Sequence, residues 1–294
     1  MQNKPDIADV ANAVPAISLI DEIGEGGFKV AYRGVVNGIE EAVKIVRIPV
    51  DPSDDSVEET NRRRLSRELQ LIGQCQCSSL VKLGSFPTTD IQIGPDKYVC
   101  YSEELIEGDN LRKRIQPGCR PSQQELATLG CCLISAVSEL ASYNTIHRDI
   151  KPLNIIATNN PDRPFVLLDL GIAFVVGATN YTVDSRAIPG SRYYLAPEMM
   201  DVDFRQSLTY RADLYAIGLT LYEFASCVNP FIAQGDSTFD TMYRIKHQNP
   251  SPLLRLRGDL DKAFCALVDQ LIRKIPALRP ANLAQLEKRM EGFK

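Results

Sequence analysis

The chain lacks the cysteine and histidine pattern of a zinc site and the cysteine content of a disulfide scaffold. It has only two histidines, and its eight cysteines do not show the paired C-x₂-C spacing of a zinc site. Cys75 and Cys77 are one residue apart, and Cys131 and Cys132 are adjacent. A disulfide-rich protein carries far more cysteine for its length than this chain of 294 residues. We therefore expect most cysteines to be small core residues in a reducing compartment.

An excess of charge of one sign is also missing. Lys plus Arg number 33 and Asp plus Glu number 37, so the formal net charge is −4. Nucleic-acid-binding surfaces usually show a clustered basic excess, so we expect no nucleic-acid partner. The chain start lacks the layout of a secretory signal, and the longest apolar stretch, 214–228, is too short to span a bilayer. These absences predict a cytoplasmic protein without a membrane segment.

The composition is that of an ordinary globular protein, and the patterning divides it into two parts. The first part shows strand patterns around a glycine cluster and one helix pattern, whereas helix patterns dominate after Gly108. The predicted strands are 17–24, 31–36, 40–48 and 98–106, with a helix at 57–74; the later helices are 121–143, 212–225, 262–272 and 282–290. We expect an α+β fold with a small strand-rich lobe and a larger, mainly helical lobe.

Glycines cluster in residues 23–31, which read Ile-Gly-Glu-Gly-Gly-Phe-Lys-Val-Ala. Such glycines let backbone amides approach phosphate oxygens, although a simple hairpin turn would also explain them. They precede a strand rather than a helix, so they do not fit a dinucleotide-binding Rossmann motif. Lys44 ends an apolar strand pattern, where its ammonium group needs a negative partner such as a phosphate or Glu68.

A second segment, 146–156, reads Ile-His-Arg-Asp-Ile-Lys-Pro-Leu-Asn-Ile-Ile. It brings together a base that can orient a hydroxyl group (Asp149), a cation for phosphate (Lys151) and an oxygen ligand for a metal (Asn154). Asp169 follows the apolar run 165–168 and offers a second oxygen ligand for Mg²⁺. Phosphoryl transfer depends mainly on positioning and charge neutralisation, which this set can supply.

This ordered set of motifs resembles the eukaryotic-type (Hanks-type) serine/threonine protein kinase family. The resemblance runs from Gly24 to Arg279 and includes HRDIKPLN, DLG and GSRYYLAPE, which begin at residues 147, 169 and 190. It implies the bilobal protein-kinase fold. The implied domains are an N-terminal extension at 1–16, an ATP-binding N-lobe at 17–107 and a catalytic C-lobe at 108–294.

The resemblance implies that the chain transfers the γ-phosphoryl group of ATP to serine or threonine of protein substrates. Asp149 would be the catalytic base and Lys151 would neutralise the γ-phosphate. Asn154 and Asp169 would hold Mg²⁺, and Lys44 would hold the α- and β-phosphates. The residues implied in ATP binding are Gly24, Glu25, Gly26, Gly27, Phe28, Ala31, Ala42, Lys44, Glu68, Glu104, Ile106 and Ile156.

Further matching residues are implied to be structural. Glu198 would form a buried ion pair with Arg279, and Asp213 would brace the catalytic loop. The lysine at position 151 and the small hydroxyl residue Ser191 resemble serine/threonine kinases, whereas tyrosine kinases usually carry an Ala-Arg pattern in this loop. Dual specificity remains an open alternative.

Regulation by phosphorylation is also implied. Arg148 would bind a phosphate on the activation segment, for which Thr182 and Ser185 are the preferred sites. The basic residue often found after the DFG segment is Phe174 here. Asp184 could therefore supply a permanent carboxylate to Arg148 instead, which would make the enzyme constitutively active.

Several positions depart from the family pattern. Lys29 replaces the third glycine of the phosphate loop, DFG is DLG at 169–171, and Glu103 falls at the gatekeeper position. A buried acid at position 103 is unusual and needs a partner. Two alternatives to an active protein kinase therefore stay open: a pseudokinase scaffold that binds partners without catalysis, and a small-molecule kinase of related fold.

Overall fold

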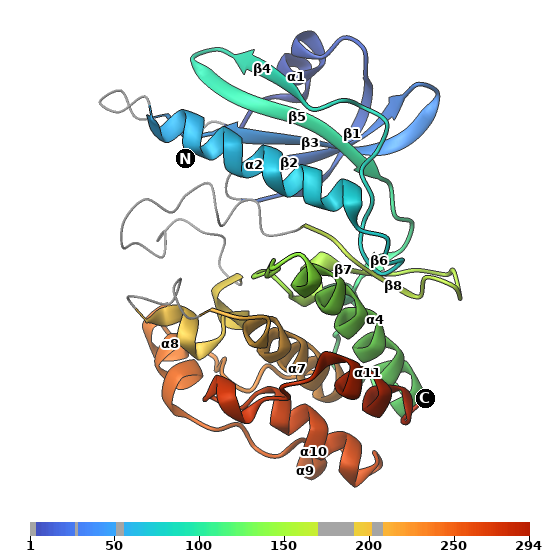
Figure 1. Ribbon diagram of the computed structural model, residues 1–294, viewed down its shortest axis with the longest axis vertical. Coiled ribbons are helices and arrows are strands. Elements are labelled where there is room, and N and C mark those ends of the chain that lie inside the picture. The colour runs from blue at the N-terminus through green and yellow to red at the C-terminus, as the bar shows by residue number, and fades with distance from the viewer. Residues whose placement is uncertain (1–3, 27–28, 51–55, 170–190, 202–207) are drawn as a thin grey trace. The chain divides into compact units, whose positions relative to one another are not determined.

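A computed structural model describes residues 4–26, 29–50, 56–169, 191–201 and 208–294 (Figure 1). These residues fall into two compact units. Within the described ranges, unit 1 takes residues 4–75 and 81–106, and unit 2 takes residues 76–80, 107–169 and 191–294. Unit 1 is built on a sheet and unit 2 is mainly helical, so the predicted α+β class with a strand-rich part and a helical part is confirmed.

Unit 1 contains a five-stranded antiparallel sheet with strand order β1-β2-β3-β5-β4. The strands are β1 (Ser18–Glu25), β2 (Lys29–Val36), β3 (Ile39–Ile48), β4 (Thr89–Ile93) and β5 (Asp96–Glu104). Asn37 and Gly38, with φ of 51° and 84°, form the two-residue turn between β2 and β3. The sequence patterns predict four of these strands and miss the short β4.

One face of the sheet is covered by the N-terminal helix α1 (Ile7–Ala13). Its Val10 is fully buried in one cluster with Val43 and Ile45 of β3. The hydroxyl of Tyr32 donates a hydrogen bond to the backbone oxygen of Pro5 at 3.1 Å. The segment that precedes β1 is therefore an integral part of unit 1 rather than a loose tail.

The second helix of unit 1 is α2 (Ser56–Gln74), which crosses in front of β3 in Figure 1. It presents the buried side chains of Leu65, Leu69 and Ile72, which are spaced three and four residues apart. This spacing places them on one side of a helix, as the sequence pattern predicts. Burial of that apolar side stabilises α2, because helices in proteins gain most of their stability from the packing of one apolar face.

Unit 2 is organised around two buried helices, α4 (Gln123–Ser142) and α7 (Arg211–Ser226). α4 packs against α7 and α11 (Leu283–Glu291), and α7 packs against α10 (Lys262–Leu271). The other helices are α3 (Leu111–Arg114), α8 (Thr238–His247) and α9 (Leu253–Leu256), with 3₁₀ turns at Pro152–Asn154, Ser191–Tyr194, Pro197–Met200 and Pro276–Leu278. A small sheet has the order β6 (Asp109–Asn110), β7 (Ile155–Ala157), β8 (Phe165–Leu167).

Burial inside unit 2 accounts for the apolar composition of both central helices. Every residue of α7 from Ala212 to Ala225 is buried, which is the pattern of a helix enclosed on all sides. A Cβ atom on Gly218 would lie 2.5 Å from Leu271 Cβ, so glycine is what lets α10 approach α7 this closely. α4 is long and apolar enough to cross a membrane by length and composition, yet 56% of its most apolar window is buried inside the protein.

The cysteines are free thiols, and all eight lie within the described ranges. Cys75, Cys100, Cys131 and Cys265 are buried, as expected of small core residues. Burial raises the pKa of Cys100 to about 12 and that of Cys131 and Cys265 to about 11. Thiols held this firmly in the protonated form are poor nucleophiles, so these three are structural.

A buried ion pair between Glu198 and Arg279 connects separate segments of unit 2. Arg279 is fully buried and donates hydrogen bonds to Glu198 Oε1 and Oε2 at 2.6 Å and 2.8 Å. It also donates to the backbone oxygens of Arg211, Arg273 and Lys274 at 2.8, 2.8 and 3.1 Å. The guanidinium thereby ties three separate stretches of unit 2 together.

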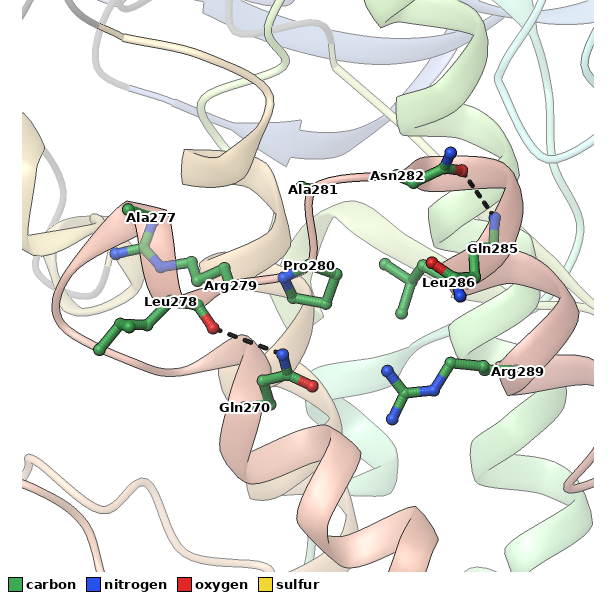
Figure 2. Close-up of a pocket in the computed structure, with 10 residues that line it drawn as sticks. All are labelled: Gln270, Ala277, Leu278, Arg279, Pro280, Ala281, Asn282, Gln285, Leu286 and Arg289. Atoms are coloured by element: carbon green, nitrogen blue, oxygen red, sulfur yellow. Dashed lines mark hydrogen bonds between the residues drawn. The ribbon is translucent and has the colours of Figure 1, made fainter.

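Figure 2 shows how the chain continues from Arg279 into α11. Asn282 caps α11 by accepting a hydrogen bond from the backbone nitrogen of Gln285 at 2.9 Å. Gln270 on α10 donates to the backbone oxygen of Leu278 at 3.4 Å. The residues around this turn line a surface pocket at one end of α11, well separated in sequence from the motifs at 147–154.

We expect Glu198→Ala to lower the free energy of unfolding by about 3–5 kcal/mol, because it leaves the buried Arg279 charge without its partner. Urea unfolding followed by circular dichroism measures the change. The matched control is Asp201→Ala, which breaks an exposed pair with Lys246 (2.8 Å) and should cost at most about 1 kcal/mol. Equal losses in the two variants would contradict the assignment.

Candidate active site

The catalytic loop of unit 2, residues 147–154, is shaped by a buried carboxylate on α7. Asp213 accepts hydrogen bonds from the backbone nitrogens of His147 at 2.8 Å and Arg148 at 2.9 Å. Arg148 has φ of 68°, a left-handed conformation that is uncommon for residues other than glycine. Such a conformation persists only where the surroundings hold it, and the Asp213 carboxylate does so here.

Asp213 is itself held in an apolar setting, with 1% of its surface exposed. Burial raises the pKa of Asp213 to about 6, while the N–H groups of Arg148 and His147 act in the opposite direction. The carboxylate therefore depends on these two donors to stay ionised inside the core. The prediction that Asp213 braces the catalytic loop agrees with this geometry.

His147 links the loop to the strand that ends before Asp169. The backbone nitrogen of Asp149 donates to His147 Nδ1 at 3.3 Å, so the ring hydrogen is on Nε2. Nε2 in turn donates to the backbone oxygen of Leu168 at 3.1 Å. Burial lowers the pKa of His147 to about 4, which keeps the ring neutral and both hydrogen bonds intact at neutral pH.

Asp149 is anchored by the two other predicted catalytic-loop residues. Lys151 Nζ donates to Asp149 Oδ1 at 2.8 Å and to Oδ2 at 2.7 Å. Asn154 Nδ2 donates to Asp149 Oδ2 at 2.8 Å and to its backbone oxygen at 2.9 Å. Lys151 and Asn154 are buried, whereas 25% of the Asp149 side chain is exposed. The structure therefore holds this carboxylate in one orientation while leaving part of it accessible.

The residues predicted to bind Mg²⁺ offer the ligand chemistry that this ion prefers. Asp169 lies two residues after β8, has φ of 57° and is partly exposed. Asn154 Nδ2 donates its hydrogen bonds to Asp149, so Asn154 Oδ1 is the side-chain atom that can bind a cation. Mg²⁺ is commonly held by one or two protein oxygens, with phosphates and water completing its shell. These two residues fit that pattern, and within the described ranges no group of three or more His, Cys, Asp or Glu could hold a metal.

In unit 1, Lys44 on β3 forms an ion pair with Glu103 on β5. Lys44 Nζ lies 3.0 Å from Glu103 Oε2, and the two side chains are 6% and 2% exposed. Ala42 is directly opposite Glu103 in the ladder, so Lys44 is its diagonal neighbour on the same face of the sheet. The buried acid expected at position 103 therefore has a cationic partner, supplied by the predicted phosphate-binding lysine.

The predicted phosphate loop lies in the hairpin between β1 and β2. Gly24 is opposite Ala31, and the backbone nitrogen of Gly26 donates to the backbone oxygen of Lys29 at 2.8 Å. Glu25 ends β1. Gly27 and Phe28 lie outside the residues that the structure describes, and so does the side chain of Glu68 on α2. The predicted pairing of Glu68 with Lys44 stays a prediction.

The remaining predicted ATP-binding residues lie on strands or next to one. Ala42 is buried on β3, and Glu104 ends β5, where its Oε1 accepts a hydrogen bond from Lys82 N at 2.9 Å. Ile106 follows β5 in unit 1, whereas Ile156 lies on β7 in unit 2. Of the predicted regulatory residues, Arg148 is described, whereas Thr182, Ser185 and Asp184 fall in a stretch outside the described residues.

One polar cluster near the site was not predicted from the sequence. Glu223, buried on α7, accepts hydrogen bonds from Tyr194, Arg112 and Asn229. Burial raises the pKa of Tyr194 well above its usual value, and the Glu223 carboxylate acts in the same direction. The cluster fixes the 3₁₀ turn Ser191–Tyr194 against α7. The signal in the sequence is a lone glutamate inside an apolar helix, which requires polar partners.

Comparison with known proteins identifies the family. The sequence matches the family described as protein kinase domain over residues 17–289. The chain therefore belongs to the protein kinase family, and it is similar to proteins named serine/threonine-protein kinases. It is 29% identical over 272 residues to the probable serine/threonine-protein kinase PknB of Corynebacterium glutamicum, covering 91% of this chain and 40% of that protein. It is 28% identical over 267 residues to PknH of Mycobacterium tuberculosis, covering 90% and 40%.

Solved structures show the same fold. A crystal structure of the PknI kinase domain of Mycobacterium tuberculosis superposes with a TM-score of 0.64 at 17% identity, covering 95% of each chain. Rad53 (residues 1–466) in complex with AMP-PNP gives 0.68 at 18% identity, covering 92% of this chain and 64% of that one. The chain spans about two fifths of the length of the curated relatives that it matches.

We expect the His147 ring to stay neutral, with its hydrogen on Nε2, from pH 7 down to about pH 5. The ring is buried and its folded-state pKa lies near 4, so protonation in this range would charge a buried group. NMR of ¹⁵N-histidine-labelled protein measures this, because the exposed His247 is the only other histidine. Titration of His147 near pH 6.5 would contradict the buried tautomer.

Proposed function

We propose that this chain is an active serine/threonine protein kinase that transfers the γ-phosphoryl group of ATP to hydroxyl groups of protein substrates. The observation that carries the proposal is the arrangement around Asp149. Two buried donors, Lys151 and Asn154, fix a carboxylate that remains 25% exposed. A phosphotransferase needs a base that is both oriented and accessible, whereas a purely structural carboxylate has no need of exposure.

The chemistry follows from these residues. Asp149 orients the substrate hydroxyl and accepts its proton as the hydroxyl oxygen attacks the γ-phosphorus. The bond between the γ-phosphorus and the bridging oxygen of ADP breaks, so ADP leaves. Lys151 lies within hydrogen-bond distance of both Asp149 oxygens and adds positive charge where the transferred group carries negative charge. The protein contributes mainly position and electrostatics, as expected for phosphoryl transfer.

Asn154 and Asp169 are proposed to hold Mg²⁺, which would neutralise the phosphate charge. Asn154 suits this role because its amide nitrogen is committed to Asp149, which orients its oxygen. Asp169 lies two residues after β8, and the backbone oxygen of the intervening Leu168 accepts the His147 hydrogen bond. The position of both ligands is thus coupled to the catalytic loop.

Unit 1 supplies the residues proposed to bind ATP, except for Ile156 on β7 of unit 2. The hairpin around Gly24 and Gly26 presents backbone amides, and Lys44 presents the ammonium group for the α- and β-phosphates. Ala42, Glu104, Ile106 and Ile156 are proposed around the adenine. A phosphotransfer assay distinguishes the two alternatives. A pseudokinase would transfer no phosphate, and a small-molecule kinase would transfer none to protein.

We expect Asp149→Asn to lower the transfer rate by about 10² to 10⁴, because the base that orients the hydroxyl is lost. Asp169→Asn should abolish Mg²⁺-dependent transfer. The measurement is incorporation of label from γ-³²P-ATP into a basic protein, followed by analysis of the labelled amino acid.

The matched control is Asp162→Asn, an exposed aspartate between β7 and β8 that should transfer at the wild-type rate. Melting temperatures show whether each variant is folded. Near-normal turnover of Asp169→Asn with normal Mg²⁺ dependence would show that the metal assignment is wrong. Labelled serine or threonine in the wild-type product would support the proposed substrate class.

A further inference from the structure

The ion pair between Lys44 and Glu103 lies entirely within the sheet of unit 1. Its two strands, β3 and β5, are paired continuously from Glu41–Glu104 to Ile48–Lys97. Both residues therefore stand on strands that backbone hydrogen bonds hold in a fixed register. Both side chains are almost fully buried, and Lys44 Nζ lies 3.0 Å from Glu103 Oε2.

Burial makes this arrangement costly unless each charge stabilises the other. An ammonium group removed from water tends to lose its proton, and a carboxylate tends to gain one. A close opposite charge counteracts both tendencies, and it also restricts the four rotatable bonds of the lysine side chain. Glu103 is therefore placed both to keep Lys44 charged and to fix where its ammonium group lies.

The face of the sheet on which the pair lies is also significant. Side chains alternate between faces along a strand, so Ala42 and Lys44 share one face with Glu103. Val43 and Ile45 point to the opposite face, where they join the core cluster that contains Val10 of α1. Glu103 thus shares a face with the proposed ATP-binding residues Ala42 and Lys44 of β3, and Val46 on the same face is also buried.

We propose that Glu103 is the positioning residue for Lys44: its carboxylate holds the Lys44 ammonium, from within the sheet, where that ammonium binds the nucleotide phosphates. The proposal rests on the proposed function, because it requires Lys44 to contact ATP. It places a counterion of this lysine on β5, which is fixed relative to β3 by backbone hydrogen bonds.

The test compares nucleotide affinities by isothermal titration calorimetry, with MgADP and adenosine as the two probes. Glu103→Gln keeps the shape of the side chain and removes its charge. We expect it to weaken MgADP binding about tenfold, the size expected for loss of one hydrogen bond between charged groups. Adenosine carries no phosphate, so its affinity should change less than about twofold.

Repeating the substitution in a Lys44→Met background separates positioning from simple packing. If Glu103 acts through Lys44, Glu103→Gln should leave the MgADP affinity of Lys44→Met unchanged within about twofold. Equal weakening in both backgrounds, or equal weakening for adenosine, would overturn the proposal. If Glu103→Gln does not fold, Glu103→Met retains the volume without the charge, and an unchanged MgADP affinity in that variant would overturn it as well.

Glu41→Gln is the matched control for removal of a buried carboxylate from this sheet. Glu41 is 5% exposed and accepts a hydrogen bond from the backbone nitrogen of Ser85 at 2.8 Å. It points to the face opposite Lys44, so its MgADP affinity should equal that of the wild type. Wild-type protein that binds MgADP but transfers no phosphate would overturn the proposed kinase activity alone. Wild-type protein that does not bind MgADP would overturn both proposals.

Discussion

The predicted catalytic loop, residues 147–154, depends on one buried carboxylate. Asp213 lies in the core of unit 2 with 1% of its surface exposed, and its two oxygens accept the backbone N–H groups of His147 and Arg148. A buried carboxylate without donors is costly, and a left-handed arginine without support is strained. The backbone N–H groups of His147 and Arg148 satisfy the buried Asp213 carboxylate, and that carboxylate holds Arg148 in its left-handed conformation. Because the loop is fixed at this point, Asp149 follows with a defined direction.

Two other pairs of charged residues in the structure also satisfy each other in a buried setting. Arg279 is matched by Glu198, and Lys44 is matched by Glu103. In each case the two partners are far apart in sequence, so the ion pair forms only when the fold is complete. Buried pairs of this kind contribute little net stability when compared with apolar residues, but removal of one partner is costly. Such ion pairs favour one arrangement of the chain over others. A site that must hold its side chains in fixed positions requires this.

The sequence is most informative where local pattern and motif coincide. The ordered motifs identify the family. Helix-forming residues with charges spaced three and four apart predict α2, and helix and strand patterns predict α4 and the strands beside the glycine hairpin. The short elements α1, β4 and α8 are missed, because each is held by tertiary packing rather than by a long periodic pattern. The contact between Lys44 and Glu103 depends on the register of two strands separated by 47 residues of chain, 49–95, which no local pattern encodes.

The most direct test of this account measures the catalytic loop in Asp213→Asn. An amide offers one oxygen and one donor group where the carboxylate offers two oxygens, so one backbone N–H loses its acceptor. Hydrogen exchange at His147 and Arg148, measured beside the phosphotransfer rate, reports both structure and function. We predict faster exchange at these amides and a rate lower by about 10², the usual effect of a small misplacement of a catalytic group. Unchanged exchange with an unchanged transfer rate would contradict the central role of Asp213.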